Sequence, residues 1–483
     1  MPIMKSFYIT TTLPYVNAEP HVGFAMELIR ADSVARFKKL QGYEVFFNTG
    51  TDEHGQKLFV AAEKEGKDVQ EYVDGYAETF RGLKEILGIS DEVHFIRTTD
   101  AHHVEAAQEF WKICDKNGFI YKGSYEAKYC VGCELEKTDS ELVEGKCSLH
   151  PNREIETINE ENYFFKWSAF QEKLLAFYEA SPNFVVPDFR YNEIKNFVKA
   201  GLQDFSISRQ KSKMSWGVEV PGDADHVMYV WFDALVNYIS TLGWPENKDQ
   251  FEKFWEKGET VQFCGKDNLR QQTAMWQAML MAAGIKNTSK VYVEGFINGE
   301  GGVKMSKSLG NVINPQDVVT EYGTEALRYY LLGEISSFED SPMSMNHFKD
   351  AYNAKLANGI GNLTSRILKM AETNLLEPVE IPEANKVWSD EYVAAFEGFN
   401  IKKAIDIVFD KMKGLDEEIQ STQPFKLVKT DPEKGKEIIK NLVICLHGVA
   451  KHLEPFLPET SKKIIEAIKA NKMPEVALFQ RKD

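Results

Sequence analysis

The sequence has little of several features that define whole classes of proteins. Only six of its 483 residues are cysteine, which is too few for a disulfide scaffold. No apolar run approaches the roughly 20 residues that span a bilayer. Residues 1–12 lack the basic start and the small-residue cleavage site of a signal peptide. We therefore expect a cytoplasmic protein without a membrane partner.

The chain also lacks an excess of positive charge, because its formal net charge is −16. This excludes a general nucleic-acid packaging protein, which would be coated in basic residues. A local basic face that binds one structured RNA remains compatible with an acidic whole. Hydrophobic residues make up 43% and charged residues 27%, the balance of a globular protein. At this length, on the order of three domains are expected.

The N-terminal segment predicts a strand, a helix and a second strand. Residues 7–16 are apolar and β-branched, residues 21–41 place apolar side chains at helical spacing, and residues 43–48 form the next apolar run. Gly42 stands where a helix C-cap is expected. Such a unit belongs to a parallel sheet, and ligands bind beyond the carboxyl ends of its strands. The polar loop 49–55 is expected there.

This α/β pattern is interrupted once and then gives way to helices. Strands at 227–231, 261–264 and 290–297 and a helix at 268–283 are expected to complete the first sheet. Helical spacing follows in 325–332, 348–370, 401–420 and 435–453. The predicted fold class is α/β, a Rossmann-type parallel-sheet domain split by an insertion and followed by an α-helical bundle. The expected parts are 1–117 and 222–310 for the sheet domain, 118–221 for the insertion, 311–345 for a linker and 346–483 for the bundle.

Two short motifs point to phosphate chemistry. His21 and Gly23 begin the predicted helix, where free N–H groups attract phosphate, His21 can donate and Gly23 permits close approach. Lys304, Ser306 and Lys307 lie in a glycine-rich loop, where two lysines can meet the charge of a departing pyrophosphate. Each motif alone also fits a blander interpretation, a helix cap in the first case and a solvated basic loop in the second. Together they are more specific, because both follow strands of one sheet.

A third constellation predicts a metal site. Cys130, Cys133, Cys147 and His150 form two close pairs separated by a short loop. Three thiolates and one imidazole can complete the tetrahedral shell of one structural Zn²⁺. The alternative is a set of reduced cysteines in a loop.

These motifs resemble those of the class I aminoacyl-tRNA synthetases, and the finer match is to the methionyl-tRNA synthetases. The resemblance rests on Pro20-His21-Val22-Gly23, Lys304-Met305-Ser306-Lys307-Ser308, Thr51-Asp52-Glu53-His54-Gly55 and the run from Tyr229 to Tyr238. It implies that Asp52 binds the methionine ammonium and that the side chain is enclosed by Leu13, Tyr15, Trp231, Leu235, Tyr238 and Gln272. The alternative for the aromatic residues is a place in the core.

The resemblance extends to the helical region. Asn362 and Arg366 match the family segment that reads the CAU anticodon, and Phe425 stands where the family usually has Trp. The alternative is that Asn362 and Arg366 are merely neighbours on one helix face. Two further departures are Phe24, where the first signature usually ends in His, and Gln272, where the family has a pocket His. The insertion looks too small for the editing domain of the isoleucine, leucine and valine enzymes.

The resemblance implies a methionine–tRNA ligase. Such an enzyme joins L-methionine to ATP as methionyl-adenylate, releases pyrophosphate, and transfers methionine to the 3′-terminal adenosine of tRNA(Met). Catalysis is expected from His21, Lys304 and Lys307 with Mg²⁺ on ATP, and the zinc is expected to be structural. Because the chain stops soon after the bundle, a monomer is expected. Two alternatives remain, a synthetase for another apolar amino acid and a non-catalytic RNA-binding module.

Overall fold

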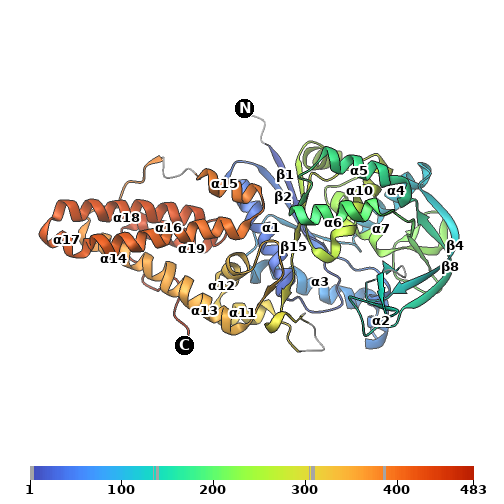
Figure 1. Cartoon of the computed structure of the whole chain (residues 1–483), viewed down its shortest axis with the longest axis horizontal. Helices are drawn as coiled ribbons and strands as arrows, with labels where there is room; N and C mark the ends of the chain where they lie inside the picture. Colours follow the sequence, from blue (N-terminus) through green and yellow to red (C-terminus); the bar gives the residue numbers. More distant parts are fainter. Residues whose placement is uncertain (1–4, 134, 138–140, 304, 306–309, 384–387) are drawn as a thin grey trace. The chain divides into compact units, whose positions relative to one another are not determined.

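The computed structural model describes residues 5–133, 135–137, 141–303, 305, 310–383 and 388–483. The chain forms two compact units, each built from segments that are distant in sequence (Figure 1). The first comprises residues 1–19, 44–82 and 92–293, and the second comprises residues 20–43, 83–91 and 294–483. Within the described residues, no helix is both long and apolar enough to cross a membrane.

A six-stranded sheet forms the centre of the first unit. Its order is β3-β2-β1-β14-β15-β9, and β1 pairs in parallel with both β2 and β14. Strand order reverses between β1 and β14, and this switch point is where ligands bind in sheets of this kind. The strands are β1 (Ser6–Thr10), β2 (Glu44–Thr51), β3 (Val93–Arg97), β14 (Glu259–Gly265), β15 (Lys290–Glu294) and β9 (Val185–Val186).

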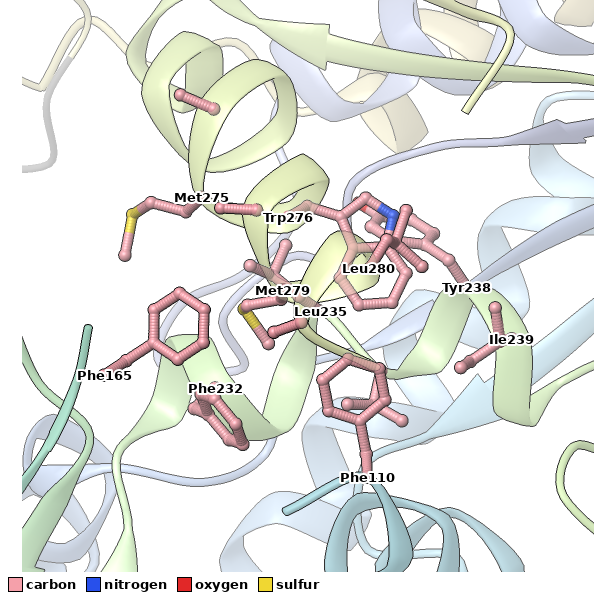
Figure 2. Packing of buried hydrophobic residues seen from close by; sticks show 14 of the residues in the cluster. Phe110, Phe165, Phe232, Leu235, Tyr238, Ile239, Met275, Trp276, Met279 and Leu280 are labelled. Atoms are coloured by element: carbon pink, nitrogen blue, oxygen red, sulfur yellow. The ribbon is translucent and has the colours of Figure 1, made fainter. Parts of the chain in front are cut away.

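Apolar side chains on several helices of this unit pack into one large core with those of the sheet. Phe7, Tyr8 and Ile9 of β1 are fully buried, as expected for a central strand with both faces covered. Figure 2 shows part of this core, where aromatic and methionine side chains from several elements meet. The helices are α2 (Gln56–Glu65), α3 (Val69–Ile86), α4 (Ala101–Lys116), α5 (Gln171–Ala180), α6 (Asp188–Lys199), α7 (Val230–Ala234), α8 (Asn237–Ser240), α9 (Lys248–Gln250) and α10 (Trp276–Ala283).

Antiparallel strands make up the rest of the first unit. The longest pair is β4 (Ile120–Cys130) with β8 (Glu156–Phe165), which pair from Ile120↔Phe165 to Tyr129↔Glu156. A separate three-stranded sheet has the order β11-β13-β12. The remaining short strands are β5 (Leu135–Glu136), β6 (Leu142–Val143), β7 (Lys146–Cys147), β10 (Phe205–Ser206), β11 (Ser208–Gln210), β12 (Glu219–Val220) and β13 (Asp223–Met228).

The second unit is mainly helical. Helices α14, α16 and α18 lie side by side in its bundle, each with one buried apolar stripe (Figure 1). Strands β16 (Ile297–Asn298) and β17 (Ser341–Pro342) pair in parallel. The helices are α1 (Val22–Leu40), α11 (Pro315–Tyr322), α12 (Thr324–Tyr329), α13 (Met345–Ala351), α14 (Asn362–Asn374), α15 (Asp390–Glu397), α16 (Ile401–Thr422), α17 (Pro424–Thr430), α18 (Pro432–Leu453) and α19 (Pro458–Ala470).

Buried charges tie α1 to the rest of the second unit. The guanidinium of Arg328 lies 2.8 Å from the Asp32 carboxylate and donates to the carbonyl oxygens of Pro455 and Phe456, which join α18 to α19. Arg30 contacts Glu294 at 3.2 Å. Because unpaired buried charges are costly, these partners hold the segments of the unit in one arrangement.

The predicted fold class is confirmed, with a parallel Rossmann-type sheet and a helical C-terminal region. Some local predictions are wrong. The strand expected at 7–16 ends at Thr10, where its pairing with β2 ends. The strand expected at 227–231 is instead the end of β13, in the antiparallel sheet, followed by helix α7, because it pairs with β11 and β12 and not with the parallel strands. The loop expected from residue 49 begins later, since β2 pairs with β3 as far as Thr51. In addition, β9, from the range 118–221, joins the main sheet beside β15.

Candidate functional site

Residues expected to bind an amino acid follow the carboxyl ends of three neighbouring strands. Tyr15 follows β1, Asp52 follows β2 and Gln272 follows β14. Tyr15 and Asp52 form a parallel bridge in which the Asp52 amide donates to Pro14 O at 3.0 Å. Asp52 is only 4% exposed. A buried carboxylate so placed, beside the segment that leaves β1 near the switch point of the sheet, is suited to a cationic ligand group.

The loop that follows Asp52 is held by several side chains. Arg97 forms a bidentate pair with the Glu53 carboxylate, at 2.7 and 2.8 Å. The Trp216 indole donates to the Glu53 carbonyl at 2.6 Å. The Tyr15 hydroxyl donates to the His54 carbonyl at 2.6 Å. The backbone on the carboxyl side of Asp52 is therefore fixed at two successive residues.

A buried carboxylate fixes the His54 ring as well. Asp233 Oδ2 lies 2.6 Å from His54 Nδ1, and Asp233 Oδ1 lies 2.8 Å from His103 Nε2. Burial by itself raises the pKa of Asp233, but attraction and hydrogen bonds from the two imidazole rings lower it to about 2. The carboxylate is therefore ionised at neutral pH.

The other residues expected around the amino-acid side chain lie in or against the core. Leu235 and Tyr238 are 2% and 1% exposed and lie near Trp276 and Leu280 (Figure 2). Gln272 Nε2 donates to the Tyr238 hydroxyl at 2.6 Å. Gln272, the departure from the family His, thus has a defined hydrogen-bond partner in Tyr238.

Trp231 and Tyr15 share a second, smaller cluster. Both are half-buried and pack against Tyr129, Tyr229 and Val230. Leu13 is half-buried in the extended segment between β1 and Tyr15. The first unit therefore brings Tyr15, Asp52 and Trp231 to one region through shared neighbours, and joins Tyr238 to Gln272.

In the second unit, His21 caps the first turn of α1. Its Nδ1 accepts a hydrogen bond from the Gly23 amide at 3.0 Å. A Cβ at Gly23 would lie 2.7 Å from the His21 ring, so the glycine makes room for the cap. Phe24, the departure from the expected His, stacks on His21 with ring centroids 4.4 Å apart. The capping interpretation of His21 is thus correct in geometry, and it is compatible with a phosphate role.

The glycine-rich loop is described only at its base. The Gly299 amide donates to Val303 O at 2.7 Å, and a Cβ at Gly299 would lie 2.9 Å from Asn311 Nδ2. Just beyond, Ile313 O accepts a hydrogen bond from the Val22 amide at 3.1 Å. The base of the loop therefore lies beside the first turn of α1. Lys304, Ser306 and Lys307 are outside the described residues.

The predicted metal ligands converge. Ligand atoms of Cys130, Cys133, Cys147 and His150 lie within 4.8 Å of one another. Cys133 Sγ is 3.4 Å from Cys147 Sγ and 3.3 Å from His150 Nδ1, and Cys130 Sγ is 3.9 Å from the same nitrogen. Bonds of roughly 2.3 Å to sulfur and 2.0 Å to nitrogen in a tetrahedral Zn²⁺ site correspond to separations of about 3.5–3.8 Å. The four residues therefore fit a tetrahedral metal ion.

One lysine connects this cluster to Tyr15. Lys57 Nζ donates to Gly132 O at 2.8 Å and lies 5.4 Å from the centroid of the Tyr15 ring. A Cβ at Gly132 would lie 2.4 Å from the His150 ring. The backbone between Cys130 and Cys133 thus contacts both a metal ligand and a neighbour of the amino-acid region.

A hollow of about 400 Å³ opens on the helical bundle. Arg366 and Phe425 both line it, and Asn362 is exposed one helical turn before Arg366. Phe425 is 45% exposed, and Met473, which also lines the hollow, is 36% exposed. Arg366 forms an ion pair with Asp416. The other lining residues are Ser365, Lys369, Met370, Ile419 and Met473.

Sequence reasoning missed the residues that support these sites. His54 and Asp233 lie inside motifs that were recognised, but nothing local shows that residues 179 positions apart in sequence are partners. Lys57 and Arg97 carried no signal at all. The adjacency of His54 to Asp52 in one polar loop was the only hint.

Comparison with known proteins finds related sequences along almost the whole chain. Residues 7–157 and 133–368 match the family described as "tRNA synthetases class I (M)". The methionine–tRNA ligase of Caldanaerobacter subterraneus is 40% identical over 96% of this chain and 74% of its own length. That of Mesorhizobium japonicum is 39% identical over 96% of this chain and 91% of its own.

Solved structures extend the likeness to the whole fold. The methionyl-tRNA synthetase of Mycobacterium tuberculosis in complex with methionyl-adenylate is 33% identical, with a TM-score of 0.89 over 99% of this chain and 100% of its own. The free form from the same organism has a TM-score of 0.81 at 30% identity. Because the family model, relatives matched over 96% of this chain and the fold all agree, the chain belongs to the class I methionyl-tRNA synthetase family.

Proposed function

We propose that this chain is a methionine–tRNA ligase. It activates L-methionine with ATP to methionyl-adenylate and pyrophosphate, then transfers methionine to the 3′-terminal adenosine of tRNA(Met). Relatives with this name, and a similar structure that holds methionyl-adenylate, support the proposal. The main supporting observation is that Asp52 is buried beyond the carboxyl end of β2 and is bridged to Tyr15, in the segment that leaves β1 near the switch point.

Asp52 would bind the methionine ammonium, because a charge-assisted hydrogen bond in a desolvated place offsets the cost of burying both charges. Leu13, Tyr15, Trp231, Leu235, Tyr238 and Gln272 would enclose the side chain. A thioether is flexible and polarizable and packs well on aromatic faces. The Gln272–Tyr238 hydrogen bond supports a wall with fixed polar groups, which a purely aliphatic ligand would leave unmatched.

Activation requires no protein nucleophile. An oxygen of the methionine carboxylate forms a bond to the α-phosphorus of ATP while the bond to the bridging oxygen breaks, and pyrophosphate leaves with that electron pair. His21, Gly23, Lys304, Ser306 and Lys307 would bind the nucleotide, and His21 and the two lysines would stabilise the developing charge. Mg²⁺ bound to ATP would neutralise phosphate charge. The described base of the lysine loop lies beside α1, which supports a shared role.

The metal bound by Cys130, Cys133, Cys147 and His150 is proposed to be Zn²⁺. Four protein ligands fill a tetrahedral shell, so the ion would supply structure and no reactive water. Because no coordination position would remain open for substrate or water, the ion would take no part in methionine activation.

Asn362, Arg366 and Phe425 are proposed to contact the anticodon. An unpaired base can stack on Phe425, while amide and guanidinium groups bind base edges. The hollow that joins Arg366 to Phe425 supports this assignment, since it is open and large enough to admit a base. Phe425 in place of Trp keeps a stacking surface and removes one donor. We further propose that the enzyme is cytoplasmic and acts as a monomer.

Amino-acid-dependent ATP–pyrophosphate exchange tests the function directly. Methionine should support exchange at least about a hundredfold better, in kcat/KM, than leucine, isoleucine or valine, since an unmatched pocket costs about 3 kcal/mol or more. If another amino acid supports exchange better than methionine, that amino acid is the substrate. Binding of tRNA without any exchange would favour the non-catalytic RNA-binding alternative. Lys307→Ala serves as a comparison, because it should depress adenylate formation more than methionine binding.

A further inference from the structure

A buried network in the first unit lies directly behind the Asp52 loop, and the proposed reaction does not use it. Asp233, on α7, is fully buried and accepts hydrogen bonds from two imidazole rings. One ring belongs to His54, two residues after Asp52. The other belongs to His103 on α4, whose Nδ1 lies 2.9 Å from the Ser240 hydroxyl of α8. One carboxylate thus joins the loop to three helices.

The charge of Asp233 determines how the rings are oriented. An ionised carboxylate is only an acceptor, so His54 must present its Nδ1–H and His103 its Nε2–H. Both distances, 2.6 and 2.8 Å, are typical of strong charge-assisted bonds. Neither ring can rotate without leaving a buried charge unpaired, which is costly.

The orientation of His54 reaches the amino-acid region through its own backbone. The His54 carbonyl accepts the Tyr15 hydroxyl at 2.6 Å, and Tyr15 is bridged to Asp52. A displaced His54 would therefore move both the phenol and the segment that bears the carboxylate. Small displacements of a carboxylate weaken a charge-assisted bond strongly, because such bonds depend on distance and angle.

We propose that Asp233 is a positioning residue for methionine, acting through His54 on the Asp52–Tyr15 pair. It touches no substrate itself. Its contribution is selective, because it holds the ammonium-binding loop and not the residues assigned to ATP. This inference rests on the proposed methionine ligase activity and adds a residue that sets affinity for the amino acid.

The test uses Asp233→Asn, which keeps the side-chain shape and removes the charge. In ATP–pyrophosphate exchange, KM for methionine should rise about tenfold, while kcat and KM for ATP change by less than about twofold. The Kd for methionine, measured by quenching of tryptophan fluorescence without ATP, should rise by the same factor. An unchanged KM for methionine, or equal changes in all three parameters, would overturn the proposal.

Two variants at His54 test the same link between Asp233 and Tyr15, and they remain informative if Asp233→Asn does not fold. His54→Asn places an amide nitrogen near the position of Nδ1 and should keep a methionine KM close to that of the unmodified enzyme. His54→Leu has similar bulk without a donor and should reproduce the tenfold rise. Where Asp233→Asn does fold, the double variant Asp233→Asn, His54→Leu should be no worse than the worse single one, because both remove one interaction. Additive effects, or equal KM values for the Asn and Leu variants, would contradict the mechanism.

Asp32→Asn provides a matched control for the loss of a buried charge. Asp32 is fully buried and paired with Arg36 and Arg328 in the second unit. This variant should lower thermal stability and leave KM for methionine unchanged. A similar rise in KM would mean that general destabilisation explains the Asp233 result and would refute the inference.

If the unmodified enzyme shows no methionine-dependent exchange, the proposed function fails, and that outcome is distinct from an unaffected Asp233 variant.

Discussion

The loop after Asp52 and the hollow around Phe425 differ in how firmly their side chains are fixed. In the loop, Glu53 and His54 are each bound by buried or half-buried partners. In the hollow, Phe425 is 45% exposed and Arg366 has a partly exposed partner, Asp416. A small charged ligand is bound best by side chains that are already ordered in the free protein, because binding then costs little conformational entropy. A flexible single-stranded RNA is matched by an open surface that offers stacking area.

The largest effect should come from the rigid region. Asp52→Ala should lower kcat/KM for methionine in exchange by about 100- to 1,000-fold, because a buried ammonium would lose its partner at a cost of ~3–4 kcal/mol. Binding of tRNA, measured by filter retention, should stay within about twofold. Retained exchange activity would show that Asp52 does not bind the ammonium, and the contrast between the two regions would lose its basis.

Metal removal should also perturb the rigid region. Cys147→Ser should abolish stoichiometric zinc, measured by elemental analysis, and should lower the melting temperature by on the order of 5 °C. Because Lys57 joins Gly132 O to the Tyr15 ring, KM for methionine should rise about fivefold. Lys57→Met offers a control, because it keeps the metal ligands and removes the lysine contact between Gly132 O and the Tyr15 ring. A stable, fully active protein without metal would contradict a structural role.

Acid titration should separate the buried network from ordinary surface charges. The pKa of Asp233 is lowered to about 2 from the ordinary aspartate value of 3.8, so its contribution to stability is present above about pH 4 and is lost as the pH falls toward 2. Urea unfolding should therefore show a stability gap between the unmodified enzyme and Asp233→Asn at pH 6 that narrows near pH 3. A gap that is constant down to pH 2.5 would exclude a lowered pKa.

Loss of the stacking surface should affect only the tRNA reaction. Phe425→Ala should reduce kcat/KM for tRNA by about tenfold, since stacking of one base contributes ~1–3 kcal/mol. Exchange should be unchanged, because that reaction needs no tRNA. Phe425→Trp is the matched control and should keep or improve charging. Equal charging by the alanine and tryptophan variants would remove Phe425 from the anticodon contact.

The smallest effect concerns the partner of Arg366. Asp416→Asn should raise kcat/KM for tRNA by up to about fivefold, because a partly exposed ion pair contributes only ~0–1 kcal/mol and competes with the base for the guanidinium. Steady-state charging at two salt concentrations measures this, and the gain should shrink at high salt. A loss of activity would mean that Asp416 positions Arg366 and does not compete for it.

Local patterns in the sequence predicted much of the architecture, but not all of it. The helices of the C-terminal region were recognisable because their apolar residues recur every 3.6 positions. The strand expected at 227–231 was misassigned, since an apolar run of that length does not distinguish a parallel strand from the end of an antiparallel one followed by a helix. The two-residue strand β9 was too short to carry any periodicity.

The candidate sites show the same division. The metal ligands could be predicted because all four lie within 21 positions, in two close pairs with the spacing of a zinc site. The resemblance located Asp52 and Trp231, but their physical neighbours could not be inferred from spacing. The departure at Phe24 acquired a meaning only in three dimensions, as a ring stacked on the His21 cap.

The sequence by itself determined the class of fold, the metal cluster and the order of the two phosphate-related motifs, because backbone periodicity and short spacings act over a few residues. Only the tertiary structure decided that His54 meets Asp233 and that Lys57 joins the metal cluster to Tyr15. Those pairings join residues far apart along the chain, and they form because burial leaves each charged group only the partner that packing brings to it.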